Sequence, residues 1–182
     1  MFLFDKDCQC LVLRATECLN RLNEWLVANR LTLNITKTCY MVFSKKRDED
    51  IKLFVDSHEI EKVTFCKYLG IFIDDKLTWQ VHIKYIYDKI VKFTGILYKL
   101  RSKLSLDWLK LIYFAFVYPY ILYGIEIYAN TFITYLDTLT KLKNKILRIT
   151  LNQPFRSHTI DLYRQCDVLP LNYLHTLSLI HI

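Results

Sequence analysis

Two adjacent carboxylates, Asp74 and Asp75, stand inside the segment FCKYLGIFIDDKLTW at residues 65–79. Nucleotidyl transferases hold two divalent metal ions with carboxylates of this kind. The pattern around the pair also predicts a strand that runs into a helix. A carboxylate at such a junction can accept hydrogen bonds from the first free N–H groups of the helix. Two chemical roles, metal binding and helix capping, are therefore open to the pair.

The cysteines offer no metal site by their spacing. They stand at positions 8, 10, 18, 39, 66 and 166, with no Cys-x-x-Cys pair and no histidine spaced to complete a zinc site. We expect reduced thiols that pack as small apolar residues. We therefore predict no metal site in this chain.

The composition favours a folded protein with an anionic partner. Of the 182 residues 53% are hydrophobic, which is too apolar for a disordered chain. The net charge of +7 favours nucleic acid or a membrane surface. The uncharged run at residues 111–125 covers 15 residues, fewer than the roughly 20 of a membrane span, and contains Pro119. We predict a buried helix broken at Pro119, with a span as the alternative.

The apolar pattern in the first part of the chain predicts a helix followed by strands. From Asp7 to Asn29 apolar residues recur every three or four positions, as on one face of a helix. Residues 39–43, 51–55 and 64–73 then have the pattern of strands, joined by the charged turn KKRDED and by DSHE. We predict an α+β fold, in which a small antiparallel β meander with a flanking helix is followed by a helical bundle.

The second part of the chain is helical and carries the excess positive charge. An apolar stripe runs from Ile83 to Leu104, and four lysines share the opposite face: Lys84, Lys92, Lys99 and Lys103. We expect a second helix, capped by Asp107, and a third over residues 133–151. On the third helix a common face holds Lys141, Lys145 and Arg148. Both faces could contact phosphates. The alternative is that each is a solvent-exposed face with no binding role.

The order of five segments resembles a known family. These are LNEWLVANRLTLNITKTCYMVF, VTFCKYLGIFIDDKLTWQVHI, GILYKLR, PYILYG and LKNKILRI. They resemble the carboxyl-terminal part of the reverse transcriptase of non-LTR (LINE-type) retrotransposons. The resemblance implies three parts: the end of the palm at residues 1–75, a helical thumb at 76–151, and the start of a post-thumb helical segment at 152–182.

The resemblance also implies roles for particular residues. Lys37 matches a lysine proposed in related polymerases as a general acid for the leaving pyrophosphate, and a solvated lysine is the alternative. The primer grip of the family matches Lys67, Tyr68, Leu69 and Gly70. We expect these four to form a tight turn that holds the primer end, or else a strand whose glycine lies at a bulge. Trp79 and His82 match a Trp-x-x-His pattern, and we assign both to the core.

The resemblance separates Asp74 and Asp75 from the metal site. In the family the metal-binding aspartates precede the segment that matches FLFDKD at residues 2–7, so we expect this chain to start after them. The Mg²⁺ ions then belong to the full-length enzyme, this chain binds no cofactor, and it is inactive alone. Capping by Asp75, one residue before Lys76, becomes the expected role of the pair.

The partners that the resemblance implies are an RNA template and a DNA primer, with no membrane, in the nucleus or the cytoplasm. The chain would be a fragment of an RNA-directed DNA polymerase that keeps the parts that position primer and template. Two alternatives remain: a non-catalytic nucleic-acid-binding module, and a small helical membrane-associated protein.

Overall fold

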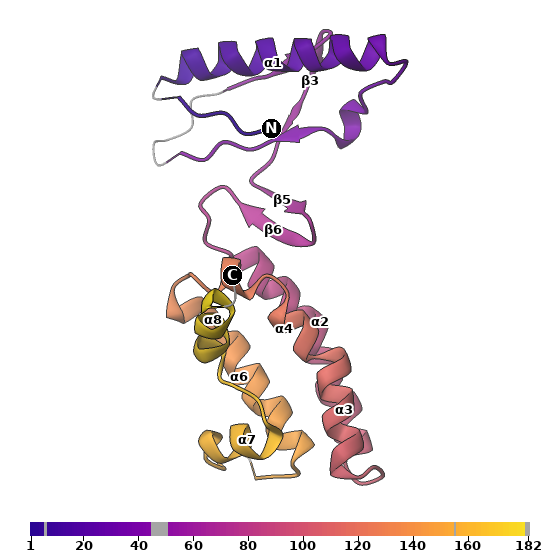
Figure 1. Ribbon diagram of the computed structural model, residues 1–182, viewed down its shortest axis with the longest axis vertical. Helices are drawn as coiled ribbons and strands as arrows, with labels where there is room; N and C mark the ends of the chain where they lie inside the picture. Colours follow the sequence, from indigo (N-terminus) through magenta and orange to yellow (C-terminus); the bar gives the residue numbers. More distant parts are fainter. Residues whose placement is uncertain (6, 45–50, 155, 181–182) are drawn as a thin grey trace. The chain divides into compact units, whose positions relative to one another are not determined.

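The computed structural model describes residues 1–5, 7–44, 51–154 and 156–180 (Figure 1). Strands and helices are both present, and the α+β class is confirmed. The chain forms two compact units. The first comprises Met1–Cys66 and Asp74–Lys76, and the second comprises Lys67–Ile73 and Leu77–Ile182. The charged turn expected at residues 45–50 lies outside the described residues.

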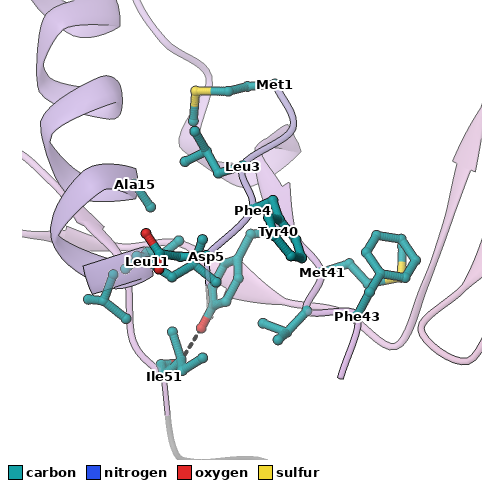
Figure 2. A pocket seen from close by; sticks show the side chains of 13 residues that line it. Met1, Leu3, Phe4, Asp5, Leu11, Ala15, Tyr40, Met41, Phe43 and Ile51 are labelled. Carbon is teal, nitrogen blue, oxygen red and sulfur yellow. Dashed lines mark hydrogen bonds between the residues drawn. The ribbon is translucent and has the colours of Figure 1, made fainter. Parts of the chain in front are cut away.

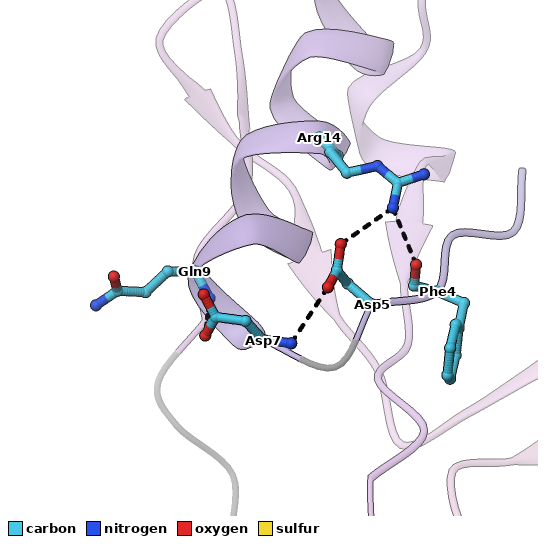
Figure 3. Close-up of polar contacts among 5 residues, drawn as sticks. All are labelled: Phe4, Asp5, Asp7, Gln9 and Arg14. Atoms are coloured by element: carbon cyan, nitrogen blue, oxygen red, sulfur yellow. Dashed lines mark hydrogen bonds and ion pairs between the residues drawn. The ribbon is translucent and has the colours of Figure 1, made fainter.

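The first unit is built on the helix α1 (Cys8–Ala28), which confirms the helix predicted from Asp7 to Asn29. Asp7 caps it, because its side chain accepts a hydrogen bond from the backbone N–H of Gln9 at 3.4 Å. Arg14 donates to Asp5 and to the carbonyl of Phe4, both at 3.1 Å, and so ties the N-terminal segment to the helix (Figure 3).

The strands of the first unit are short, and one pair differs from the expected meander. Strands β2 (Phe54–Val55) and β3 (His58–Glu59) are antiparallel, but β1 (Cys39–Tyr40) pairs in parallel with β4 (Glu61–Lys62). The segment DSHE, expected as a connection, turns at Asp56 and Ser57 with positive φ and supplies β3. Only Ile60 separates β3 from β4, so the two short strands follow one another along the chain.

The core of the first unit is small and partly open. Ala15 and Leu19 of α1 are buried with Leu53, Val55 and Ile60. Beside them lies a cavity of about 340 Å³ that is lined largely by apolar side chains, including the exposed Phe4 (Figure 2). The Tyr40 hydroxyl donates a hydrogen bond to the carbonyl of Ile51 at its edge.

The second unit is a helical bundle that follows strands β5 (Phe65–Tyr68) and β6 (Ile71–Asp74). Its helices are α2 (Gln80–Leu100), α3 (Leu106–Phe116), α4 (Tyr118–Leu122), α5 (Ile125–Tyr128), α6 (Ile133–Thr150), α7 (Thr159–Cys166) and α8 (Leu171–Ile180). The stripe predicted from Ile83 onward supplies Ile83, Ile86, Ile90 and Leu97 to the core. Residues of α6, among them Leu139 and Ile146, are fully buried in the same core, so α2 and α6 form its centre.

Both expected helix caps, Asp75 and Asp107, are wrong. Helix α2 begins at Gln80 rather than Lys76, because Leu77 and Trp79 adopt positive φ and keep the chain out of the helix. Asp75 is therefore too far from α2 to cap it. Asp107 does not cap α3 either, because it lies inside the first helical turn, where a carboxylate still favours the positive end of the helix dipole.

The apolar run at residues 111–125 forms the end of α3, all of α4 and the first residue of α5. Helix α3 ends at Phe116, and Pro119 lies in the first turn of α4, where a missing N–H costs no hydrogen bond. Val117, Ile121 and Ile125 are completely buried, but Leu111, Phe116 and Tyr123 are more than half exposed. The predicted break is therefore confirmed, whereas burial holds for one side of the run only. Among the described residues, no helix has both the length and the apolar character to cross a membrane.

Candidate nucleic-acid interface

The segment that matches a primer grip forms a tight turn. Leu69 and Gly70 are the two residues between β5 and β6, and their φ angles are +46° and +85°. A two-residue hairpin loop with positive φ at both positions is the type I′ turn, whose twist matches that of the paired strands. Gly70 adopts this conformation freely, whereas Leu69 is held there by its surroundings. The expected tight turn is therefore present, and Gly70 does not lie at a bulge.

Tyr123, at the end of α4, holds this turn in place. Its hydroxyl donates a hydrogen bond of 2.5 Å to the carbonyl of Leu69. Its ring lies against Gly70, where an added Cβ would come within 3.1 Å of it. A side chain at Gly70 would thus meet the tyrosine ring, so the glycine allows close packing as well as the turn.

The next residue, Gly124, packs against the first residue of β6. Its φ is +67°, and a Cβ added there would lie 2.6 Å from Cδ1 of Ile71. The segments YLGI (residues 68–71) and PYILYG (residues 119–124) thus pack against each other. Sequence reasoning missed this contact because the two segments lie more than 50 residues apart and no periodic pattern connects them.

His82 supports the same hairpin from α2. Its Nδ1 accepts a hydrogen bond of 3.3 Å from the backbone N–H of Phe72. Burial lowers the pKa of His82 to about 4, so the ring is neutral at neutral pH and can accept at Nδ1. Tyr128 packs edge-on against the imidazole with 5.2 Å between ring centroids. The assignment of His82 to the core is confirmed, and Trp79 packs against that core half-buried.

The surface of the turn combines a cation with large exposed side chains. Lys67 is exposed, and its Nζ lies 5.3 Å from the ring centroid of Tyr85 and 5.7 Å from that of Phe72. Such cation–π contacts restrict where the ammonium group can go. Tyr68 and Leu69 are 56% and 73% exposed. A rigid turn thus presents a positive charge and two side chains to a partner.

The lysine face predicted between residues 84 and 103 is mostly present. Lys84, Lys92 and Lys99 are exposed on α2, and at about 100° per residue they fall within an arc of roughly 80°. Lys103 is exposed but lies beyond the last residue of α2, in the following turn. Asp88 falls within the same arc and offsets part of the charge. The α2 lysine face, defined here as these four lysines, is accessible to an anion.

The basic face predicted on the third helix is weaker than expected. Lys141 is paired with Asp137 at 2.6 Å. Arg148 is half-buried, and its Nη2 donates to the carbonyl of Ser157 at 3.2 Å, which connects α6 to the following loop. Lys145 is exposed. Arg148 thus has a structural contact that the sequence pattern did not indicate.

A fourth basic residue of α6, Lys143, lies in the core. It is completely buried, donates a hydrogen bond to the carbonyl of Leu169, and has Nζ 5.2 Å from the ring centroid of Tyr163. Burial lowers its pKa to about 8. Lys143 shares the buried face of α6 with Leu139, Leu142 and Ile146. This position in the helical period could have predicted its burial, but a lysine is normally expected at the surface.

Lys37 ends the 3₁₀ helix Ile35–Lys37 in the first unit and is exposed. Its backbone N–H donates to the Asn34 side chain at 3.2 Å, which caps this short helix. The exposed side chain suits the solvated alternative, and the general-acid role stays a prediction.

The described residues do not fit the Mg²⁺ ions that the family implies. Nowhere in this part of the chain do three or more His, Cys, Asp or Glu side chains gather so as to hold an ion. Asp74 is buried with 6% exposure, and the backbone N–H of Asp75 donates to the carbonyl of Thr64 at 2.9 Å.

Comparison with known proteins gives relatives of one kind. The RNA-directed DNA polymerase from mobile element jockey of Drosophila funebris is 28% identical over 156 residues, which cover 84% of this chain and 17% of that protein. The protein of the same name from Drosophila melanogaster is 26% identical over the same shares. The probable RNA-directed DNA polymerase from transposon X-element of Drosophila melanogaster is 26% identical over 71% of this chain and 14% of its own length.

The chain spans less than a fifth of the length of these relatives. No family model matches it, and no solved structure matches it significantly. Over most of its length the chain is thus similar to the RNA-directed DNA polymerases of the non-LTR retrotransposons jockey and X-element, which confirms the resemblance drawn from its sequence.

Proposed function

We propose that this chain is part of a retrotransposon RNA-directed DNA polymerase, acts inside the cell, in the nucleus or the cytoplasm, and positions a DNA primer on an RNA template. Residues 1–75 then correspond to the end of the palm, 76–151 to the thumb and 152–182 to the start of the post-thumb segment. The observation that carries the proposal is the fixed turn at Leu69–Gly70, held by Tyr123, with Lys67 exposed beside it.

Positioning requires a surface that holds a nucleic-acid backbone without reading its sequence. A rigid turn suits one point of contact, because it loses little conformational entropy on binding. The α2 lysine face suits a second, since exposed lysines neutralise phosphates whatever the bases are. Both features belong to the second unit, so one part of the chain carries both contacts.

Catalysis is assigned to the parent enzyme rather than to these residues. The described side chains offer no set of carboxylates for two metal ions, and an RNA-directed DNA polymerase needs such a set. A non-catalytic nucleic-acid-binding module is the second candidate, and the α2 lysine face supports it equally. The two candidates differ in whether the rest of a polymerase accompanies this chain, whereas both require binding to nucleic acid.

The test is the salt dependence of binding to a primer–template duplex. Each neutralised phosphate contributes about 0.9 to the slope of log affinity against log salt. We expect a variant with Lys84, Lys92, Lys99 and Lys103 changed to Gln to lose about three to four units of that slope. Fluorescence anisotropy with a labelled duplex from low to physiological salt measures it.

A matched control removes four positive charges from the first unit instead. It carries the changes Arg21→Gln, Arg30→Gln, Lys52→Gln and Lys76→Gln, all at exposed positions. The two variants have the same net charge, so a general effect of charge would flatten both slopes alike. An unaltered slope in the α2 variant, or an equal loss in the control, would show that the α2 lysine face does not meet phosphates.

A further inference from the structure

A cavity of about 310 Å³ lies beside the turn, within the second unit. Its walls come from the turn (Lys67 and Gly70), from α2 (His82 and Tyr85) and from the α4 region (Tyr120 and Tyr123). This volume is at the lower end of the range of small-molecule sites, about 300–1,000 Å³. The cavity therefore has room for one small planar group.

The walls of the cavity combine aromatic rings with one cationic side chain. Three tyrosines and one histidine contribute rings, and Lys67 contributes the only charged group among the described residues that line it. None of those lining residues is acidic. Lys67 lies 5.3 Å from the ring centroid of Tyr85, so the cation and an aromatic surface are presented together. Aromatic rings and a cation side by side are what proteins use to hold a base and its phosphate.

The cavity is also firmly built. The hydroxyl of Tyr123 is bonded to Leu69, and the Nδ1 of His82 is bonded to the backbone of Phe72. These contacts fix two of its walls without a ligand. Tyr120, in contrast, is 40% exposed, and its side chain is accessible to a group that enters from solvent.

We propose that this cavity receives one unpaired nucleotide at the end of the primer strand, with its base among the tyrosine rings and its phosphate at Lys67. The inference rests on the proposed function, which puts the primer end at this turn. A base inside a duplex is paired and stacked, and taking it out costs a few kcal/mol. A base in a single-nucleotide overhang is unpaired from the start, so the cavity selects it over a flush end.

The experiment compares three labelled primer–template duplexes that share one double-stranded part. The first has a flush primer end, the second has a 3′ overhang of one nucleotide, and the third has the same overhang without its base. Stacking of one base supports an affinity gain of about fivefold or more. We expect the whole chain to bind the second duplex at least about fivefold more tightly than the first and the third.

Two variants place the effect in the cavity. Tyr120→Leu removes an aromatic wall but keeps a smaller apolar side chain. We expect it to abolish the preference while the affinity for the flush duplex stays the same. Tyr98→Leu is the control, because Tyr98 is 56% exposed on α2 and does not line the cavity. We expect this control to keep the preference.

The outcomes separate this inference from the proposed function. Salt-dependent binding of all three duplexes with equal affinity would overturn the cavity proposal and leave the positioning role intact. A preference that survives in Tyr120→Leu, or that the overhang without a base also shows, would place the contact elsewhere. Failure to bind any duplex would overturn both.

Discussion

The contact between Gly124 and Ile71 can be tested with a single methyl group. We expect Gly124→Ala to destabilise the second unit. An alanine at φ +67° costs about 1–2 kcal/mol relative to a relaxed backbone. Its Cβ would also lie 2.6 Å from Cδ1 of Ile71, which is 8% exposed and has little room to move. Relief through a strained side-chain rotamer adds about 0.5–1.5 kcal/mol.

Gly95→Ala is the matched control and should act in the opposite direction. Gly95 lies inside α2 and is exposed, and apart from its chain neighbours and the helix backbone no atom lies within 4 Å of an added Cβ. An alanine there is about 0.5–1 kcal/mol more favourable than glycine. Both changes restrict the unfolded chain by a similar amount, so this contribution cancels when the variants are compared. We expect Gly95→Ala to be more stable than Gly124→Ala by about 2–4.5 kcal/mol.

The assay is urea unfolding followed by circular dichroism, with the free energy of unfolding taken from the midpoint and slope. Similar slopes in the two variants would show that the native state keeps its compactness. Variants that agree within about 0.5 kcal/mol would contradict the close packing of Gly124 on Ile71. In that case the hairpin around Leu69–Gly70 would lose one of its supports, and the hydrogen bonds of Tyr123 and His82 would remain.

Two other features give further predictions. Because burial lowers the pKa of Lys143 to about 8, below the 10.5 of an exposed lysine, the unfolded state binds more protons between these values, and Lys143 makes stability rise with pH. The unfolding free energy of the natural chain minus that of Lys143→Met should rise by at most about 1.4 kcal/mol per pH unit from pH 8 to 10. A difference that does not change with pH would contradict the lowered pKa of Lys143. Asp75→Asn should change stability by less than about 0.5 kcal/mol, because Asp75 does not cap α2, and the chain should extend no primer with Mg²⁺ or Mn²⁺. Template-dependent incorporation that this change abolishes would instead place an active site at Asp75.

The sequence predicted the elements whose signals are local. Helix α1 and the buried stripe of α2 follow from the periodicity of their apolar residues. The start of α2 could not be predicted in the same way. Leu77 and Trp79 have positive φ, which no residue preference indicates for leucine or tryptophan, so the helix was expected four residues too early.

The candidate site was predicted less completely, because its geometry depends on contacts far apart in the sequence. Gly70 indicated a turn, but nothing in the local pattern pairs it with Tyr123. Arg148 was expected on a charged face, yet it bonds to a loop carbonyl. Lys143, which the sequence pattern did not single out, is buried. The environment of a lysine or arginine comes from the elements that pack against it, which its own helix does not specify.

The segments that resemble retrotransposon reverse transcriptases contain few of the exposed lysines that we propose to bind nucleic acid. The quoted segments YLGI, WQVHI and PYILYG meet around the turn through the contacts of Phe72 with His82 and of Tyr123 with Leu69. Packing alone is a sufficient reason for these residues, since each satisfies a hydrogen bond or fills space. The lysines at 84, 92 and 103 lie outside these segments and are exposed, so changing them tests binding without disturbing this packing. The salt-slope experiment therefore tests function, whereas the glycine pair tests the fold that positions it.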